Sequence, residues 1–444
     1  MKVVIVGAGF AGLRLARKLN NKGGFEVTLI DKYNYHQFQP LFYQVATAAL
    51  DASSISFPLR KAFHRTKNVH IRMEELRQVL PAEKKIITDS ETISYDVLVL
   101  AMGADTNFFG NQQLAANAFP MKATVEAIQL RHRFIQNFEE AIIAQDPETL
   151  QRMMNIVIAG GGPTGVELAG ALAEMRKHVL PKDYPELDFS KMNIYLLDGG
   201  ERLIAGMSEK SSADVMRYVK KLGVEVRLKT LVKEYDGKKA YLGDGTTIET
   251  EMLIWAAGIK GNVPEGIDKA LVARGNRIKV DRFNQVQGFD GLYVLGDLAY
   301  METPLYPNSH PQVASVAIQQ AENLASNLFK MERKSNPKTL TEFEYNDKGS
   351  MATVGRNLAV VDVPRPKLHF RGLWAWLIWM GLHLFLILGV KNRVFVFINW
   401  VISYFTYDQS LRLIFKEFYR PKLPVDSSKQ TQVGGTQGLQ AVVK

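Results

Sequence analysis

The chain of 444 residues contains no cysteine. This absence excludes disulfides, thiolate metal sites, iron–sulfur clusters and redox-active thiol pairs. Any electron transfer by such a chain would have to use a bound organic cofactor. The eight histidines are scattered without the spacing of metal ligands, so we expect no metal site.

A secretory signal is also missing from the first residues. The sequence MKVVIVGAGFAG enters an apolar strand pattern within two residues and has no basic segment before it. We therefore expect most of the protein to stay in the compartment where it is made. The length predicts two or three domains, and the apolar fraction of 46% is ordinary for a globular protein.

A glycine-rich loop follows the first predicted strand. Residues 3–12, VVIVGAGFAG, place Gly7, Gly9 and Gly12 between an apolar β-branched run and a segment with helical spacing. The first glycine permits a tight turn, the second lets the backbone approach a pyrophosphate, and the third lets the helix pack on the strand. The next strand ends in Asp31, whose carboxylate can accept hydrogen bonds from ribose hydroxyls. This combination predicts a dinucleotide-binding domain.

The same pattern recurs in residues 155–170, NIVIAGGGPTGVELAG, with Gly160, Gly162 and Gly165 at the three positions. The following strand ends in Asp198, and residues 178–193 are inserted before it. A carboxylate at this position accepts from a free 2′-hydroxyl and repels a 2′-phosphate, so NADH is preferred over NADPH.

Three further apolar runs end in glycine-containing turns. They are residues 95–105, 251–260 and 291–299, and the last ends in Gly296–Asp297. An acid at the carboxyl end of a strand lies where open α/β sheets bind ligands.

These motifs resemble those of the flavoproteins that carry two dinucleotide-binding domains, and the resemblance covers about residues 1–330. It implies an α/β fold with two Rossmann-like domains, the first binding FAD and the second NADH. The FAD contacts that it implies are Gly7, Gly9, Phe10, Ala11, Gly12, Asp31, Lys32, His36, Ala101, Gly103, Gly296 and Asp297. The NADH contacts that it implies are Gly160, Gly162, Pro163, Thr164, Gly165, Glu167, Asp198 and Gly258.

Finer motifs look like those of the type II, non-proton-pumping NADH:quinone oxidoreductases. Residues 34–50, NYHQFQPLFYQVATAAL, are similar to the stretch that lines the flavin in that family. Residues 160–172 include Glu167, whose counterpart lies close to the flavin, and Glu167 is therefore a candidate catalytic residue. The alternative for Glu167 is an acid in the first helical turn, favoured by the helix dipole. Disulfide reductases and sulfide:quinone reductases act through cysteines beside the flavin, which this chain lacks.

The quinone signature of that family, Ala-Gln-x-Ala-x-Gln on a helix, maps onto residues 314–319 with one departure. The second glutamine is present as Gln319, followed by Gln320, and both are candidate catalytic residues. Ser315 replaces the first glutamine. Because Pro311 is a natural first helical residue, we expect the helix to include Gln312, with Gln312, Ser315 and Gln319 on one face. Gln312 would then supply the amide that Ser315 lacks. The predicted quinone contacts are Gln312, Ser315, Gln319 and Gln320, and a solvated helix face is the alternative.

The C-terminal part of the chain carries the longest apolar run. Residues 372–390, GLWAWLIWMGLHLFLILGV, contain no charged residue and are long enough to span a bilayer. Residues 394–407 are too short to return across it, and residues 410–420 have the composition of an interfacial helix. We therefore favour a monotopic anchor in one leaflet over a single spanning helix. We place His383 at the lipid boundary, and a position beside the quinone is the alternative.

The charge of this region agrees with lipid as its partner. Residues 371–424 hold seven Lys or Arg against two acids, which is +5 of the total +10, and four of the five tryptophans. A basic surface suits nucleic acid or anionic lipid, and the adjacent apolar runs favour lipid. A buried helical hairpin with a solvated rim is the alternative.

These observations predict an α/β protein with two Rossmann-like domains and a C-terminal amphipathic helical anchor. The expected parts are residues 1–115 and 266–335 for FAD, 116–265 for NADH, 336–424 for membrane association and 425–444 as a disordered tail. The predicted function is oxidation of NADH through FAD with reduction of a lipophilic quinone, at the cytoplasmic face of the membrane, without proton pumping or nucleic-acid binding. Dimerisation through the C-terminal region would suit the family. Two alternatives stay open: a reductase of a soluble electron-carrier protein, and an NADH-sensing flavoprotein with little turnover.

Overall fold

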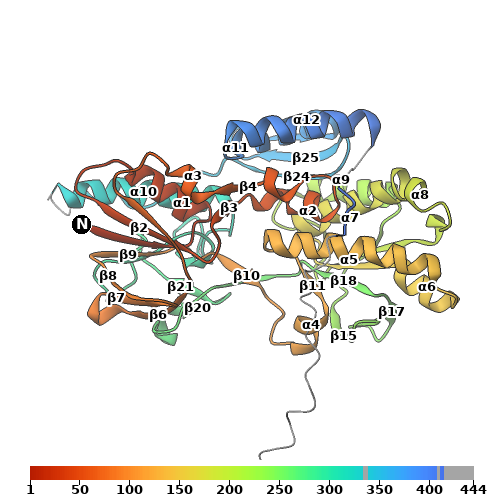
Figure 1. Ribbon diagram of the computed structural model, residues 1–444, viewed down its shortest axis with the longest axis horizontal. Helices are drawn as coiled ribbons and strands as arrows, with labels where there is room; N and C mark the ends of the chain where they lie inside the picture. The colour runs from red at the N-terminus through yellow and green to blue at the C-terminus, as the bar shows by residue number, and fades with distance from the viewer. Residues whose placement is uncertain (334–338, 408–410, 415–444) are drawn as a thin grey trace, which may run out of the picture.

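The computed structural model describes residues 1–333, 339–407 and 411–414. Two five-stranded parallel sheets lie side by side along the long axis of the molecule, and a C-terminal unit lies against one side of it (Figure 1). This arrangement confirms the predicted α/β class with two Rossmann-like units.

The first sheet has the strand order β22-β9-β1-β2-β5. Its strands are β1 (Lys2–Val6), β2 (Glu26–Asp31), β5 (Val69–Met73), β9 (Val97–Leu100) and β22 (Leu292–Val294). One face packs against α1 (Phe10–Leu19) and α10 (Ala314–Glu332), and the other against β6 (Leu76–Leu80), β7 (Lys85–Thr88) and β8 (Thr92–Ser94). The central strands β1 and β9 are almost entirely apolar because both of their faces are covered, whereas the edge strand β5 exposes His70 and Arg72. Since β1 lies between β2 and β9, the ligand crevice of such a sheet opens at the carboxyl end of β1.

The second sheet repeats this plan with the order β11-β18-β12-β13-β14. Its strands are β11 (Phe119–Pro120), β12 (Asn155–Ala159), β13 (Asn193–Leu197), β14 (Glu225–Arg227) and β18 (Met252–Trp255). The helices α5 (Thr124–Ile143), α7 (Pro163–His178) and α9 (Glu209–Lys221) pack on one face, and β15 (Val232–Tyr235), β16 (Lys239–Leu242) and β17 (Thr247–Glu249) pack on the other. An antiparallel pair, β10 (Ala104–Thr106) with β19 (Ile259–Gly261), joins the two units (Figure 1).

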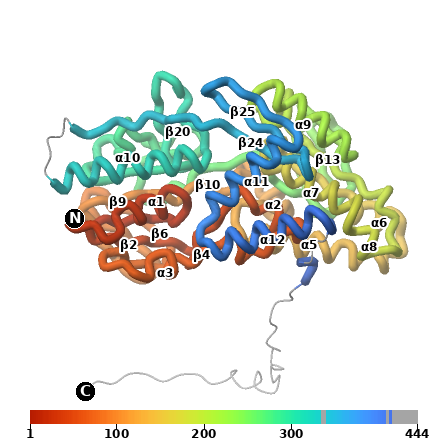
Figure 2. Tube along the Cα trace, turned by 90° about the horizontal axis from the view of Figure 1, so that it is seen from above, coloured from red at the N-terminus to blue at the C-terminus, as the bar shows by residue number. Residues whose placement is uncertain are grey.

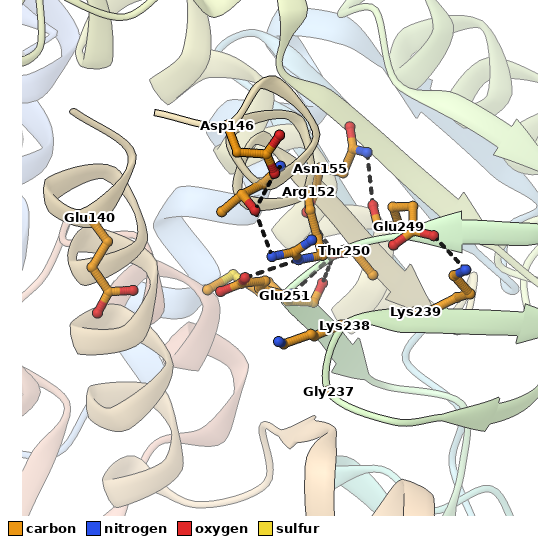
Figure 3. Close-up of polar contacts among 12 residues, drawn as sticks. Glu140, Asp146, Arg152, Asn155, Gly237, Lys238, Lys239, Glu249, Thr250 and Glu251 are labelled. Carbon is orange, nitrogen blue, oxygen red and sulfur yellow. Dashed lines mark hydrogen bonds and ion pairs between the residues drawn. The ribbon is translucent and has the colours of Figure 1, made fainter. Parts of the chain in front are cut away.

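An ion-pair cluster closes the amino edge of the second sheet (Figure 3). The carboxylate of Glu251, only 11% exposed, lies 2.9 Å from the guanidinium of Arg133 and 3.0 Å from that of Arg152. The hydroxyl of Thr250 donates to the carbonyl of Asn155 over 2.6 Å. The polar groups at this edge are therefore paired with one another. The edge that is free to bind a ligand is the opposite one, at the carboxyl ends of the strands.

The C-terminal unit begins with a three-stranded antiparallel sheet that the sequence analysis missed. Its strands are β24 (Ser350–Gly355), β25 (Leu358–Val363) and β26 (Leu368–Arg371), and it packs between α7 and the following helices. At Gly170 of α7, a Cβ atom would lie 1.5 Å from the carbonyl oxygen of Val354, so only glycine permits this approach. The sequence analysis predicted helices in this region, which α11 and α12 confirm, but not the sheet that precedes them.

The long apolar run is not one helix. Helix α11 (Gly372–Leu386) ends before the run does, the chain turns at Gly389 with φ of +87°, and α12 (Val390–Thr406) packs beside α11 (Figure 2). In the described part of the chain, no helix combines the length and the apolarity needed to cross a membrane. Residues 411–414 are described and are not helical. The rest of the predicted interfacial helix at 410–420, and the tail 425–444, lie outside the described residues.

The remaining elements connect these parts. They are β3 (Tyr35–Gln37), α2 (Phe42–Ala46), β4 (Ser56–Pro58), α3 (Leu59–Ala62), α4 (Gln112–Asn117), α6 (Pro147–Met154), α8 (Leu180–Asp183), β20 (Val272–Ala273), β21 (Arg277–Lys279) and β23 (Ala299–Tyr300).

Candidate active site

The two glycine loops have nearly the same geometry. Gly7 and Gly160 adopt φ of +101° and +116°, and a Cβ on either would lie 2.3–2.4 Å from a carbonyl oxygen, that of Ala101 or Ala256. A Cβ on Gly12 would lie 1.8 Å from the carbonyl oxygen of Gly7, and Gly165 stands in the same relation to Gly160, at 1.9 Å. These four positions require glycine because the loop, the helix and a neighbouring strand end meet there.

The middle glycines differ, because a Cβ on Gly9 or on Gly162 would meet no atom within 4 Å. Each of these two residues is the N-cap of a helix, α1 or α7, so open space lies in front of unpaired backbone N–H groups. Such a cradle is the physical requirement for a pyrophosphate. The structure thus contains two cradles that fit two dinucleotides.

Each of the two acidic residues that are predicted to bind a ribose also forms a hydrogen bond with the glycine loop of its own unit. Asp31 accepts from the backbone N–H of Ala8 over 2.6 Å, and Asp198 accepts from that of Gly161 over 2.5 Å. Burial raises the pKa of Asp31, although these hydrogen bonds oppose the rise. Near Asp198, the guanidinium of Arg202 donates to the carbonyl oxygens of Ala205 and Met207. Arg202, the arginine nearest to Asp198 in the sequence, is therefore held within its own loop rather than left free to bind a 2′-phosphate.

Several other residues predicted for the first dinucleotide surround its cradle. His36 is buried, its Nδ1 lies 2.9 Å from the carbonyl oxygen of Ala8, and burial lowers its pKa. Phe10 packs edge-on against His36. Gly103 and Gly296 both adopt φ of +67°. Lys32 instead lies over the ring of Tyr33, 5.3 Å from its centre.

One residue near Asp297 was not predicted. The ammonium group of Lys122 lies 3.6 Å from the carboxylate of Asp297 and 3.3 Å from the amide oxygen of Gln39. Lys122 follows β11 of the second unit, so it links this unit to the first. No sequence motif marks it, because its partners are distant in the chain.

The predicted quinone contacts at the start of α10 point in different directions. Gln312 donates to the backbone carbonyl of Asp297 over 2.9 Å, and Gln320 is buried and accepts from the N–H of Gly296 over 2.7 Å. Ser315 lies 2.8 Å from the hydroxyl of Tyr345, and Gln319 forms two 3.0 Å hydrogen bonds with the backbone of Asn346.

The expected start of this helix is wrong, because α10 begins at Ala314 and leaves Gln312 outside it. Val313 is its N-cap in an extended conformation, although Pro311 is compatible with a first turn. Gln312 is therefore not on one helical face with Ser315 and Gln319, and whether it replaces the missing glutamine stays a prediction.

A cavity of about 110 Å³ lies around Glu167, between the second unit and the C-terminal helices. Its lining comes from five separate elements: Tyr43, Gln44 and Thr47 of α2 and its end, Glu167 and Glu174 of α7, Thr353 to Gly355 of β24, Trp376 and Trp379 of α11, and Trp400, Ser403 and Tyr404 of α12. Burial raises the pKa of Glu167 to about 8, against a weak 3.5 Å hydrogen bond from the N–H of Thr353. Glu167 is therefore largely protonated at neutral pH and can act as an acid.

Two residues of α11 lie deeper than expected. Trp379 is 2% exposed and lines the cavity rather than an outer aromatic belt. His383 is 8% exposed and stacks on Trp379 at 4.2 Å, and burial lowers its pKa to about 4. The preference for His383 at the lipid boundary is therefore wrong. The spacing of Ala375, Trp379 and His383, four residues apart, marks the buried side of this helix.

The outward side of the helix pair is apolar. Trp374, Phe385, Val390 and Phe405 are each at least 70% exposed, and many of the aliphatic residues between them are also exposed. In Figure 1, α11 and α12 form the upper edge of the molecule, and in Figure 2, which is seen from above, they lie on the side that faces the viewer. We call this surface the apolar edge; it consists of the exposed residues of α11 and α12. An exposed apolar surface of this kind marks a membrane or protein contact.

Two parallel sheets, each with a glycine cradle, are the features of a nucleotide-dependent oxidoreductase. Comparison with known proteins supports this assignment. Residues 1–321 match the family described as pyridine nucleotide-disulphide oxidoreductase. Residues 348–407 match the family described as NDH2 C-terminal domain, which contains the C-terminal sheet, α11 and α12.

Individual relatives are more specific. The chain is 33% identical to the type II NADH:quinone oxidoreductase Ndh of Mycobacterium tuberculosis, over 91% of this chain and 88% of that one. It is 30% identical to the type II NADH:quinone oxidoreductase of Haemophilus influenzae, over 81% and 86%. Its fold is similar to that of NDH2 from Plasmodium falciparum in complex with NADH, with a TM-score of 0.83, 22% identity and coverage of 94% and 99%. The chain belongs to the type II NADH:quinone oxidoreductases.

Proposed function

We propose that the protein oxidises NADH and reduces a lipid-soluble quinone, with FAD as the bound redox cofactor. The observation that carries this proposal is the cavity around Glu167. It connects α7, whose N-terminus belongs to the second glycine cradle, to the helices that form the apolar edge. An acid, a dinucleotide site and a lipid-facing surface thus meet at one place, as membership in this family leads one to expect.

The first cradle would hold FAD. Gly9 leaves room for the pyrophosphate, Asp31 is placed for a ribose, and Asp297 follows β22 at the same sheet edge. When bound, FAD supplies the hydride-accepting and electron-donating chemistry. Lys122 would keep the Asp297 carboxylate in place from the other unit.

The second cradle would hold NADH rather than NADPH. The carboxylate of Asp198 stands where the adenine ribose would lie and repels a 2′-phosphate. Arg202 is bound to backbone carbonyls, and Lys229 is paired with Glu201 at 2.9 Å. The nearby cations therefore have other partners.

The cavity would hold the quinone headgroup. Reduction of a quinone to a quinol consumes two electrons and two protons; protonated Glu167 would supply one proton to a quinone oxygen and solvent water the other, with the electrons coming from the reduced cofactor. The predicted quinone contacts Gln312, Ser315, Gln319 and Gln320 are not among the residues that line this cavity. Gln320 would act through the Gly296 backbone that it holds.

The apolar edge would lie in one leaflet of the membrane. Its exposed side chains bury apolar area in the bilayer, while Lys391 and Arg393 at the start of α12 can reach anionic headgroups. This makes the protein a peripheral, monotopic membrane protein, which we place at the cytoplasmic face. The C-terminal region is also where we place a homodimer contact.

The test is anaerobic NADH oxidation by the purified protein with a short-chain quinone as sole acceptor. Fast turnover without a carrier protein is expected, and Glu167→Gln should slow it more than tenfold while reduction of the flavin by NADH stays intact. Turnover only on addition of a soluble carrier protein would favour the carrier alternative. Reduction of the flavin by NADH without turnover with any acceptor would favour the alternative of an NADH-sensing flavoprotein.

A further inference from the structure

The indole of Trp379 has an N–H group without a well-formed hydrogen bond. The side chain is 2% exposed, and its Nε1 forms no hydrogen bond of ordinary geometry within the described residues, although it lies near the carboxyl group of Glu167. Buried donors are almost always paired, because an unpaired one costs about 1–3 kcal/mol. A buried donor that lines a cavity is therefore placed for a ligand acceptor.

A second indole in the same cavity shows the usual arrangement. The N–H of Trp400 donates to the amide oxygen of Gln44 over 2.7 Å, and the amide nitrogen of Gln44 donates to the hydroxyl of Tyr43 over 2.8 Å. The chain therefore gives the N–H of Trp400 a well-formed hydrogen bond and gives the N–H of Trp379 none.

The free N–H is held in a fixed direction. The Trp379 ring stacks on His383 at 4.2 Å and 27° and packs against Trp400 at 5.5 Å. His383 is itself held by its Nδ1, 2.7 Å from the backbone carbonyl of Trp379. A donor that is already oriented loses little entropy when it binds an acceptor.

Trp379 and Glu167 line the same cavity. The indole lies close enough to Glu167 to favour the ionised carboxyl, although burial outweighs this effect and raises the pKa. With Glu167 protonated, both side chains are donors, and Trp376 and Trp400 supply aromatic walls. The cavity volume of about 110 Å³ is below the roughly 150 Å³ that accommodates benzene in a protein core, so a bound ring would fill the cavity completely.

The matching ligand is a flat ring with a carbonyl acceptor and no donor, which describes a quinone. We propose that the Nε1–H of Trp379 donates a hydrogen bond to one carbonyl of the bound quinone and holds that carbonyl beside Glu167. This inference rests on the proposed function and adds the residue that positions the headgroup.

The test compares Trp379→Phe with Trp400→Phe in the full-length flavin-loaded protein. Both substitutions remove the same ring atoms from the same cavity, but only the first removes an N–H that the chain leaves free. We expect the KM for a short-chain quinone to rise roughly tenfold in Trp379→Phe, the equivalent of one hydrogen bond, and clearly less in Trp400→Phe. Reduction of the flavin by NADH and turnover with ferricyanide should match the wild type in Trp379→Phe.

Equal increases in KM for the two variants would attribute the effect to lost volume and overturn the inference. So would an unchanged KM in Trp379→Phe. A wild-type protein that reduces its flavin but never a quinone would instead overturn the proposed function, which keeps the two failures distinct.

A second measurement uses the wild-type protein alone. With ¹⁵N-labelled indoles, the Trp379 N–H signal should move downfield when a short-chain quinone is added, and the Trp400 signal should move less. A Trp379 signal that does not move at saturating quinone contradicts the inference even if Trp379→Phe fails to fold.

Discussion

Glu167 places a protonated carboxyl group inside the protein, and its burial makes stability depend on pH. Its pKa is about 8 in the folded chain against an ordinary value of 4.5. Between these two values the folded state binds the extra proton, so the free energy of unfolding falls as pH rises. The expected loss is at most about 1.4 kcal/mol per pH unit.

Glu167→Gln removes this titration. We expect the variant to be more stable than the wild type at pH 9, by a few kcal/mol at most, and the advantage to disappear toward pH 4. Urea unfolding at a series of pH values measures the difference. Parallel pH curves for the two proteins would show that Glu167 is ionised in the folded state at neutral pH.

We expect Asp198 to determine the coenzyme preference by its charge. Asp198→Asn keeps the size of the side chain and removes the repulsion of a 2′-phosphate, so kcat/KM for NADPH relative to NADH should rise about tenfold. Steady-state kinetics with both coenzymes measure this ratio, with Asp188→Asn, an exposed acid of the same unit, as the control. An unchanged ratio would mean that Asp198 only holds Gly161.

The residues of the cradles were predictable because the glycines of each loop lie within five residues of one another in sequence. Gly7 and Gly12 are five residues apart and touch, as do Gly160 and Gly165. The cavity was not predictable in the same way, because its lining joins residues 43–49, 167–174, 353–356, 376–379 and 400–404. Glu167 was found only by resemblance, and no motif marked Trp379.

At the scale of elements, one hydrogen-bonded cluster fastens the C-terminal sheet to α9. The carboxylate of Asp362 accepts from Ser208, Ser211 and His369 over 2.8–3.0 Å, and His369 also lies 3.1 Å from Asp214. Burial raises the pKa of Asp362, but these hydrogen bonds outweigh it and lower the pKa overall.

Asp362→Asn should loosen this attachment. A carboxyl with a lowered pKa stabilises the folded state above its ordinary value near 4, and this stabilisation is lost as pH falls further. We expect the variant to lose about 1–3 kcal/mol at pH 7 and to converge with the wild type in strong acid. Denaturant unfolding followed by tryptophan fluorescence measures both. Equal stability at pH 7 would contradict the prediction.

The elements of the C-terminal unit were the hardest to predict, for a physical reason. Helices α11 and α12 bury apolar residues on one side and expose apolar residues on the other, so hydrophobic periodicity does not identify the inner face. Ala375 and Trp379 are buried while Trp374 and Phe385 are exposed, although all four are apolar. The preceding strands were missed because they are short and the adjacent apolar run dominated the interpretation.

For the whole molecule, we expect the apolar edge to decide whether the protein lies at a membrane. Phe385 and Phe405 are 71% and 77% exposed, and their joint substitution to Glu should lower partition onto lipid vesicles more than tenfold. Turnover with a long-chain quinone in vesicles should fall further than turnover with a short-chain quinone in solution. Ile143→Glu, which changes a residue of α5 that is 77% exposed, is the matched control. Unchanged vesicle binding would assign the apolar edge to a protein partner.

The strands of the first sheet come from two separate parts of the chain, and this arrangement has a consequence for biosynthesis. Strand β9 ends at Leu100, and its outer neighbour β22 begins only at Leu292, whereas all five strands of the second sheet lie between Phe119 and Trp255. A ribosome adding about 5–20 residues per second needs about 10–40 s to make the intervening segment. The second unit can therefore fold during translation while the first waits with an open edge. The FAD that we propose for the first cradle, whose predicted partner Asp297 follows β22, would then be acquired late, after the NADH-binding half is already in place.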